Sequence, residues 1–332
     1  MPLRIIRNDI TKVKADAVVN TANPMPVIGG GTDTAVYEAA GKEQLLAQRR
    51  KIGEITPGNA EYTSAFDLDA KYIIHTVGPA WIDGGHGEKE ILHSCYRNSL
   101  ELAAKLSCES IAFPMIATGV YGFPKDEALQ IALGEINRFL LSHDMDVILV
   151  VFDKDSFRLS GKLVGDIEEY IDEEAARTIR EAEFSWNMDY ERRIMNSRMN
   201  RRILSGNAKS LDDVLAKSEP DFKDKLFELI DKTGMTDAEV YKKANLTRSV
   251  FSNIRCKTNY IPKKATITAL AVALELDMKD FVDLLSRAGY ALSPSDKFDR
   301  IITYYFTNQK YDIFEINAVL FSYGQQTLGY YE

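Results

Sequence analysis

The chain has 332 residues, of which 45% are hydrophobic, so it can bury a large core, and its length favours two domains over one. Its formal net charge of -8 at pH 7 argues against a protein that coats nucleic acid along its whole length. A local basic surface can still be concealed in that average, so the position of the charges along the chain has to be considered.

Cysteine usage and hydropathy bear on the cellular compartment. Cys95, Cys108 and Cys256 have neither metal-ligand spacing nor the even, dense arrangement of a disulfide framework. The N-terminus lacks an apolar stretch of signal-peptide length, and no segment approaches the roughly 18 apolar residues of a membrane span. We therefore expect a cytoplasmic protein with no membrane partner and no metal site.

Short apolar, β-branched runs alternate with amphipathic helical stretches from residue 1 to about 174. The predicted strands cover residues 3–6, 17–19, 60–63, 72–77, 111–114 and 147–152. The predicted helices cover residues 33–41, 88–106 and 125–143. This alternation predicts an α/β domain over residues 1–174, in which helices cover a sheet.

Charged residues dominate the next segment. An acidic stretch at 166–174 is followed by a basic one at 192–202, and few residues between them are apolar enough to form a core. Opposite charges on such a segment pair locally or with a neighbouring domain. We therefore expect a charged helical linker over residues 175–220.

From about residue 221 onward the pattern is entirely helical. Gly234 stands where a glycine commonly ends a helix, and Thr236 with Glu239 forms a capping box that opens the next one. Later helices are predicted at 248–255, around 267–274, around 281–285, at 295–307 and at 311–323. We divide this part into a helical domain at 221–291 and a C-terminal helical pair at 292–332.

Two glycine-rich loops are predicted near the carboxyl ends of strands. Gly29, Gly30 and Gly31 precede the helix that begins near Asp33, and the segment 118–124 follows the strand at 111–114. Backbone without a side chain can approach a ligand closely and direct amide groups at an anion. Neither loop fits the dinucleotide-binding pattern G-x-G-x-x-G. The pair of loops instead predicts a clamp on a pyrophosphate.

Six segments of the first half form an ordered pattern, which is made by Asn8–Thr11, Asp16–Asn23, Gly29–Asp33, Ala39–Gly41, Tyr72–Pro79 and Ala117–Gly122. This pattern resembles the macrodomain family, in particular its MacroD-type branch of ADP-ribosyl hydrolases and O-acetyl-ADP-ribose deacetylases. The resemblance covers nearly the whole first half of the chain. It implies a three-layer α/β/α macrodomain with a mixed sheet that takes ADP-ribose or an ADP-ribosylated protein as its ligand and needs no cofactor.

The resemblance also implies contacts with each part of ADP-ribose. Asp9 and the backbone of Ile10 would bind adenine, and Phe152 would stack on it; alternatively, Asp9 is a turn residue and Phe152 is a core aromatic. The implied contacts to the diphosphate and distal ribose are Asn20, Gly29, Gly30, Gly31, Thr118, Gly119, Val120, Tyr121 and Gly122. Among these, residues 119–122 would wrap the diphosphate, and Tyr121 would close over the distal ribose.

Asn23 and Asp33 are the implied catalytic pair. The amide of Asn23 offers a donor and an acceptor to the hydroxyls of the distal ribose. Asp33 would orient or activate the attacking water, although aspartate is also a favoured N-cap for the helix that begins there. His75 lies in an apolar strand and is interpreted as packed structure rather than as a catalyst.

Four positions depart from the family pattern. Ile28, Thr32, Tyr37 and Ala117 stand where the branch commonly has glycine, valine, histidine and serine. The departures leave Asn23 and Asp33 in place, but they alter the loops that would position water. We expect a metal-independent hydrolase that removes mono-ADP-ribose from acidic side chains or deacetylates O-acetyl-ADP-ribose. A non-catalytic ADP-ribose reader is the alternative.

The helical domain contains a basic stretch. Between Val240 and Leu274 there are seven Lys and Arg residues and no Asp or Glu. The segment resembles a Cro/repressor helix-turn-helix, with the third helix as its recognition element. The predicted nucleic-acid contacts are Arg248, Ser249 and Ser252 towards bases and Lys257, Lys263 and Lys264 near phosphates, with Arg255 also in the contact set.

A DNA role implies a homodimer, because helix-turn-helix proteins pair two half-sites. It would make the chain a regulator whose macrodomain senses ADP-ribose. The competing interpretation is a helical bundle that binds protein or packs on the acidic surface of the first domain.

Overall fold

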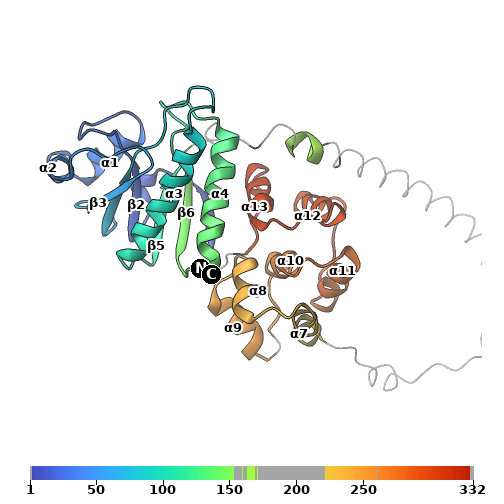
Figure 1. The fold of residues 1–332 in the computed structure, drawn as a ribbon. Coiled ribbons are helices and arrows are strands. Elements are labelled where there is room, and N and C mark those ends of the chain that lie inside the picture. The colour runs from blue at the N-terminus through green and yellow to red at the C-terminus, as the bar shows by residue number, and fades with distance from the viewer. Residues whose placement is uncertain are drawn as a thin grey trace, which may run out of the picture.

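The computed structural model describes residues 2–152, 159, 163–168, 170, 221–258 and 260–329 (Figure 1). The predicted linker at 175–220 lies outside these residues. Within them, an α/β domain is followed by a helical module, which we define as helices α7 to α13. None of the helices in this described part is both long and apolar enough to cross a membrane.

A six-stranded mixed sheet forms the centre of the α/β domain. Its strands are β1 (Leu3–Arg7), β2 (Ala17–Thr21), β3 (Ala60–Ser64), β4 (Tyr72–Thr76), β5 (Ser110–Pro114) and β6 (Asp146–Val151). Their order is β1-β6-β5-β2-β4-β3, and every neighbouring pair is parallel except β3 with β4. Each predicted strand is found, with its ends shifted by at most two residues. The two edges of the sheet are therefore β1 and β3.

Helices cover both faces of the sheet. Helices α1 (Thr32–Ala40) and α2 (Lys42–Ile52) share one apolar cluster with Val18 of β2, and helices α3 (Glu88–Lys105) and α4 (Lys125–Ser142) share another with Val19. Neighbouring residues of a strand point to opposite faces, so β2 contributes to both clusters. The predicted three-layer α/β/α arrangement is confirmed (Figure 1).

Helix α2 was not predicted from the sequence. It follows α1 directly after Gly41, whose φ of 94° suits glycine and breaks the helical path. Its sequence carries little apolar periodicity, and its two buried side chains are Leu45 and Arg49. A buried arginine reads as a polar position in a sequence pattern, so the amphipathic face of this helix was concealed.

The helical module contains α7 (Phe222–Thr233), α8 (Asp237–Lys243), α9 (Arg248–Cys256), α10 (Lys264–Ala273), α11 (Met278–Arg287), α12 (Lys297–Thr307) and α13 (Ile313–Ser322). The predicted capping box is present, since Thr236 and Glu239 bond reciprocally to each other's backbone amides at the start of α8. Gly234 ends α7 in the left-handed conformation, with φ 70°. The prediction of an all-helical C-terminal region is confirmed.

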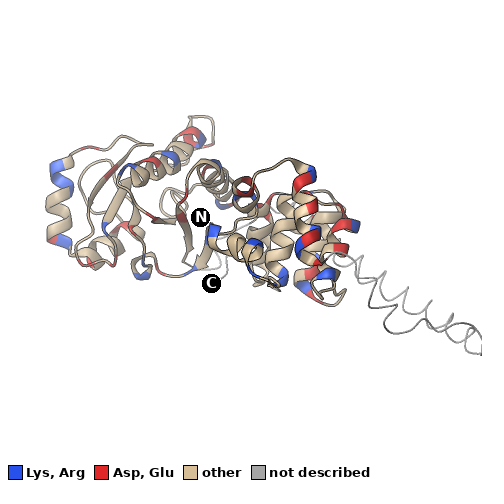
Figure 2. Ribbon diagram, turned by 90° about the horizontal axis from the view of Figure 1, so that it is seen from below, with Lys and Arg blue, Asp and Glu red and all other residues tan. Residues whose placement is uncertain are grey.

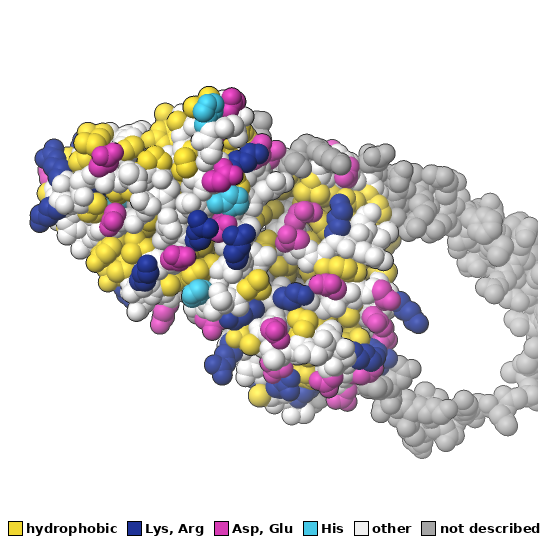
Figure 3. Space-filling view, in the orientation of Figure 1, with side chains coloured by type: hydrophobic (Ala, Val, Ile, Leu, Met, Phe, Trp, Pro, Cys, Tyr) yellow, Lys and Arg dark blue, Asp and Glu magenta, His cyan; other side chains and the backbone are white. Residues whose placement is uncertain are grey.

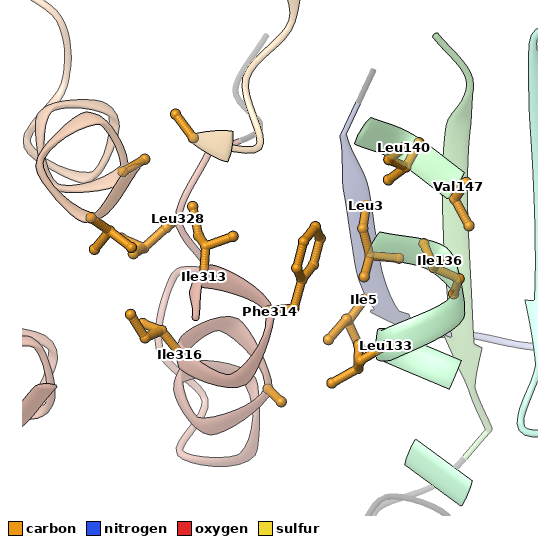
Figure 4. Close-up of a cluster of buried hydrophobic side chains, with 14 of the residues drawn as sticks. Leu3, Ile5, Leu133, Ile136, Leu140, Val147, Ile313, Phe314, Ile316 and Leu328 are labelled. Atoms are coloured by element: carbon orange, nitrogen blue, oxygen red, sulfur yellow. The ribbon is translucent and has the colours of Figure 1, made fainter. Parts of the chain in front are cut away.

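The module packs against β1 and α4 rather than standing apart from the α/β domain. Phe314 of α13 projects towards Leu3 and Ile5 of β1 and Leu133 of α4 (Figure 4). These side chains belong to one cluster of buried residues that continues from the α3/α4 layer into the module. Apolar surface of both the module and the α/β domain is buried at this junction, so the two parts stabilise each other.

Asn245, between α8 and α9, covers the edge of β1. Its Oδ1 accepts a hydrogen bond from the Leu3 amide at 2.7 Å, and its Nδ2 donates to the Leu3 carbonyl at 3.0 Å. A side-chain amide thus makes the donor–acceptor pair that a neighbouring strand would make. Because Asn245 is buried, these backbone groups of the edge strand are satisfied without water.

Candidate functional site

A cleft of about 600 Å³ opens at the carboxyl ends of the parallel strands. Asn8 follows β1, Thr21 ends β2, Pro114 ends β5 and Val150 lies near the end of β6, and all four line the cleft. In open parallel sheets, ligands bind outside the carboxyl ends of the strands. The volume lies within the usual range for small-molecule sites.

Most of the residues implicated by the sequence line this cleft. The predicted ligand and catalytic residues found there are Asp9, Ile10, Asn23, Gly29, Gly30, Gly31, Asp33, Thr118, Gly119, Val120, Tyr121 and Phe152. The prediction missed the lining residues Asn8, Thr21, Met115 and Lys125. Their position at or just beyond strand ends, or at the start of α4, is the signal that could have found them.

Asn23 and Asp33 lie on either side of Gly29. A Cβ atom on Gly29 would lie 2.7 Å from Asn23 Nδ2 and 3.4 Å from Asp33 Oδ2. The first distance is too short for a real Cβ contact, so a side chain at this position would force the Asn23 amide to move. The structure therefore brings the predicted catalytic pair together at one end of the cleft.

Asp33 lies in the first turn of α1 but is not its N-cap, which is Gly31. Its Oδ2 accepts the Gly29 amide and its Oδ1 accepts the Asn20 side-chain amide, both at 2.6 Å. Burial raises the pKa of Asp33, while these two hydrogen bonds and the charge of Arg49 lower it. The outcome is a fixed carboxylate at the cleft that remains a better base than an exposed aspartate.

Asn20 does not line the cleft, contrary to the prediction. Its side chain is fully buried and points away from the ligand space, towards Asp33 and His75. Alternation along β2 explains the error: Asn20 is directed into the α1 side of the sheet, whereas Thr21 at the strand end reaches the cleft. Asn20 therefore holds Asp33 from behind.

His75 is packed structure, as the sequence indicated. It is fully buried, and its ring nitrogens lie 3.2 Å from Asn20 Nδ2 and 3.0 Å from Thr63 Oγ1. Burial, followed by the charge of Arg49, lowers the pKa of His75 to about 3, so the imidazole is neutral. A neutral ring whose Nδ1 accepts from Asn20 would donate from Nε2 to Thr63.

The opposite end of the cleft is built from the ends of β1 and β6. Asp9 caps the 3-10 helix η1 (Ile10–Lys12) by accepting the Thr11 amide at 2.9 Å, so the turn role and a place in the cleft coexist. Phe152 is 71% exposed, which excludes the alternative that it is a core aromatic. Its ring is available to a flat ligand at this end.

The two glycine-rich loops face each other across the middle of the cleft. A Cβ on Gly30 would lie 3.9 Å from Val120 Cγ2, and the Tyr121 hydroxyl donates to Asn23 Oδ1 at 3.4 Å. Unlike residues 118–121, Gly122 does not line the cleft, and its contact with the ligand stays a prediction. Its φ is 69°, and its backbone amide donates a hydrogen bond to the Gly119 carbonyl, so Gly122 is the turn residue that returns the loop to α4.

Most of the residues predicted to contact nucleic acid are exposed on or near α9, but one of them is not. Arg248, Ser249, Ser252, Arg255 and Lys257 lie exposed on α9 or directly after it, and Lys263 is exposed before α10. Lys264 is the exception, since its Nζ donates to Asp299 Oδ2 at 2.5 Å and to the Ala291 carbonyl at 2.7 Å. It is a structural ion-pair residue, which corrects its predicted phosphate contact.

Acidic residues distant in sequence neutralise much of the basic stretch. Arg255 pairs with Asp237 and lies over the Phe227 ring at 4.2 Å. Two further pairs join Lys243 to Glu275 at 3.1 Å and Lys242 to Asp144 at 3.5 Å. Figure 2 shows acidic and basic positions interspersed along the helices of the module, and Figure 3 shows side chains of both signs on the face in view. The acid-free sequence therefore does not produce an equally basic surface.

Comparison with known proteins assigns the α/β domain to a family. The macro domain profile matches residues 19–132. A macro domain-containing protein of Mesorhizobium japonicum is 48% identical over 159 residues, which span 47% of this chain and 90% of the relative. The O-acetyl-ADP-ribose deacetylase of Citrobacter rodentium is 44% identical over 167 residues, which span 49% of this chain and 94% of the relative.

A solved macrodomain of Oceanobacillus iheyensis with ADP is 41% identical, with a TM-score of 0.45, and the match covers 46% of this chain and 85% of that one. Each match leaves about half of this chain uncovered. The two sequence relatives, in contrast, are covered over nearly their whole length. The chain therefore belongs to the macro domain family.

Proposed function

We propose that the α/β domain binds ADP-ribose and hydrolyses an acyl ester of its distal ribose. This chemistry is shared by O-acetyl-ADP-ribose and by ADP-ribose attached to an acidic protein side chain. The observation that carries the proposal is the pairing of Asn23 with Asp33 across Gly29 at one end of the cleft, opposite Asp9 and Phe152. The similarity to the O-acetyl-ADP-ribose deacetylase of Citrobacter rodentium supports the same chemistry.

The cleft suits the parts of ADP-ribose in order. Adenine would stack on Phe152 and donate its amino group to Asp9. The diphosphate would lie between the two glycine-rich loops, where the amides that begin α1 and α4 favour negative charge. This order puts the distal ribose beside Asn23, Asp33 and Tyr121.

Asp33 supplies the general base in this proposal. Its carboxylate would orient a water molecule and take a proton from it as the water oxygen bonds to the ester carbonyl carbon. The proton would then pass to the ribose oxygen as the ester bond breaks, and the Asn23 amide would hold the ribose hydroxyls. Two hydrogen bonds fix the carboxylate, so it need not reorganise when water attacks. Water is the nucleophile, and the products are a carboxylic acid and ADP-ribose.

Calorimetry with ADP-ribose is the direct test, with Phe152→Ala as the informative variant. Loss of stacking is expected to weaken ADP-ribose binding about 10-fold, because stacking of a base on an aromatic ring contributes about 1–3 kcal/mol. Leu141→Ala, which removes another exposed apolar side chain, is the matched control and should bind normally. Wild-type protein that fails to bind ADP-ribose contradicts the proposal.

A turnover assay distinguishes a hydrolase from a non-catalytic ADP-ribose reader. O-acetyl-ADP-ribose and a protein carrying mono-ADP-ribose on acidic side chains should each be converted to free ADP-ribose, as measured by mass spectrometry. Tight binding of ADP-ribose with both esters left intact would rule out hydrolysis and favour the reader.

We propose DNA binding through α9 as a second candidate function. The observation in its favour is that Arg248, Ser249 and Ser252 lie exposed at the N-terminal end of this helix, where recognition helices contact bases. The ion pairs of Arg255 and Lys264 reduce the number of cations available to phosphates. The electrostatic part of this candidate is therefore weaker than the sequence indicated.

A salt titration of duplex binding tests this candidate. The logarithm of the binding constant should fall linearly with the logarithm of salt concentration, and Arg248→Ala should weaken binding. Lys232→Ala, which removes an exposed cation of α7 already paired with Glu228, should leave binding unchanged. Negligible duplex binding at low salt, or equal effects of the two variants, would refute DNA binding through α9.

A further inference from the structure

Arg49 of α2 is a buried cation whose hydrogen bonds are made to backbone carbonyls. Its side chain is 1% exposed. One terminal nitrogen donates to the Gly53 carbonyl, and the other donates to the Asn23 carbonyl at 3.1 Å and to the Pro24 carbonyl at 3.0 Å. The guanidinium therefore joins the C-terminal end of α2 to the segment that carries Asn23.

Burial of a guanidinium is costly, so its position calls for a reason. Removing a charge from water is unfavourable unless hydrogen bonds replace the lost hydration. An apolar side chain would fill the same volume without that cost. The planar fork of arginine, in contrast, can bond several fixed acceptors at once and hold them in one geometry. We therefore interpret Arg49 as a residue that fixes the backbone carbonyls it bonds to, and not merely as one that fills space.

The segment around Asn23 depends on this kind of support. The Ala22 amide donates to the Thr76 carbonyl at 2.9 Å, and the Ile55 amide donates to the Pro24 carbonyl at 2.9 Å. The Asn23 side chain itself bonds to loop partners, through Nδ2 to the Val27 carbonyl at 3.1 Å and Oδ1 to the Tyr121 hydroxyl at 3.4 Å. Arg49 is bound to the carbonyl of Asn23, directly beside the side chain that enters the cleft.

We propose that Arg49 is a positioning residue, which holds the Asn23–Pro24 backbone so that the Asn23 amide stays in place to bind the distal ribose. The inference rests on the proposed function, because it assigns Asn23 to that ribose. It concerns a residue outside the cleft, on a helix whose sequence pattern gave no indication of the site.

The charge of Arg49 also acts on Asp33. Asn20 bonds to Asp33 and has the neutral His75 behind it. The charged and titratable groups that interact electrostatically with Asp33 are Arg49 of α2, Tyr37 of α1 and Tyr121 of the second glycine-rich loop, and Glu61 of β3 interacts in the same way with Arg49. Burial raises the pKa of Asp33 and Arg49 opposes that rise. Loss of the cation should therefore raise the pKa of Asp33 further. The fall of the turnover number at low pH, which is the acidic limb of the pH profile, should then occur at higher pH.

The test compares three variants of the full chain. Arg49→Met keeps the length of the side chain without donors or charge, Arg49→Lys keeps the charge with a different donor geometry, and Arg50→Met removes the exposed neighbouring charge as the control. Affinities for ADP-ribose and for ADP, which lacks the distal ribose, are measured by calorimetry. The turnover number is measured against pH, and thermal unfolding reports folding.

Arg49→Met is expected to lower the turnover number about 10-fold or more, since small misplacements of catalytic groups are costly. It should weaken ADP-ribose binding more than ADP binding and shift the acidic limb upwards. Arg49→Lys should also lower the ratio of ADP-ribose to ADP affinity while leaving the limb in place, and Arg50→Met should resemble the wild type.

An unchanged affinity ratio in folded Arg49→Met would overturn the inference. If that variant does not fold, the same ratio in Arg49→Lys decides, and an unchanged value again overturns it. A wild-type protein that does not bind ADP-ribose is a different result, because it removes the proposed function itself. If the wild type binds ADP-ribose without turnover, the affinity ratio alone still tests the role of Arg49.

Discussion

Asp33→Asn is expected to lower the turnover of ADP-ribose esters about 10²–10⁴-fold, the usual contribution of a general base. Asparagine preserves the shape of the side chain but cannot take a proton from water. The wild-type rate should fall at low pH, as Asp33 becomes protonated. Because burial raises the pKa of Asp33, this acidic limb should lie above the ordinary titration of an aspartate. Initial rates measured against pH check both statements.

Binding and folding controls separate this effect from loss of structure. ADP-ribose affinity should change far less than turnover, because Asp33 acts mainly when water attacks. Glu38→Gln removes an exposed carboxylate from the same helix and should behave like the wild type. Asp33→Ala serves as a second variant, since the amide introduced by Asp33→Asn would face the donors Asn20 and Gly29. Wild-type turnover in both Asp33 variants would exclude this residue as the base.

Asn245→Ala is expected to lower the free energy of unfolding by about 3 kcal/mol, because it leaves buried amide and carbonyl groups of the β1 edge without partners. The substitution removes the two bonds to Leu3 and a third, from Nδ2 to the Leu328 carbonyl at 3.4 Å. Urea denaturation measures the loss. Hydrogen exchange of the Leu3 amide should accelerate, which locates the effect at the edge strand.

Backbone conformation has to be distinguished from lost hydrogen bonds in this experiment. Asn245 has φ 53°, a conformation that alanine tolerates less well than asparagine. Asn245→Gly removes the same hydrogen bonds without that strain, so the destabilisation common to both variants reports the contacts with β1. A glycine variant with wild-type stability and slow Leu3 exchange would show that Asn245 does not stabilise the sheet edge.

The docking of the helical module bears on the site as well as on stability. β1 leads directly into Asn8 and Asp9, which line the end of the cleft that we propose for adenine, and the free edge of the strand is covered by α13 and Asn245. The Arg7 guanidinium lies 5.7 Å from the centre of the Phe321 ring of α13. Contacts of the module therefore reach the strand that positions Asp9.

Prediction from the sequence succeeded where the signal was local. Short apolar, β-branched runs identified all six strands, and the capping box at Thr236 was located by residue types three positions apart. The glycines at 29–31 predicted a loop close to a ligand, and in the structure all three line the cleft, with Gly29 close to Asn23 and Asp33. These features depend on periodicity, turns and caps, which are written in neighbouring residues.

The errors have a common cause in long-range packing. Asn20 was assigned to the ligand because it lies within a segment that resembles the macrodomain pattern, yet the fold buries its side chain between Asp33 and His75. Lys264 was assigned to phosphate because no acid is near it in sequence, but Asp299 lies 35 positions later and 2.5 Å away. Neither partner can be inferred from a sequence window.

The sequence by itself determined the α/β layer pattern and the all-helical C-terminal region, because these follow from local periodicity and backbone requirements. The cleft residues were implied by the resemblance of six ordered segments to the macrodomain family. Only the tertiary structure decided that α2 brings Arg49 beneath Asn23, that acids neutralise the basic stretch, and that Asn245 completes the β1 edge. Each of these depends on which distant segments meet. That is set by the burial of apolar surface over the whole chain.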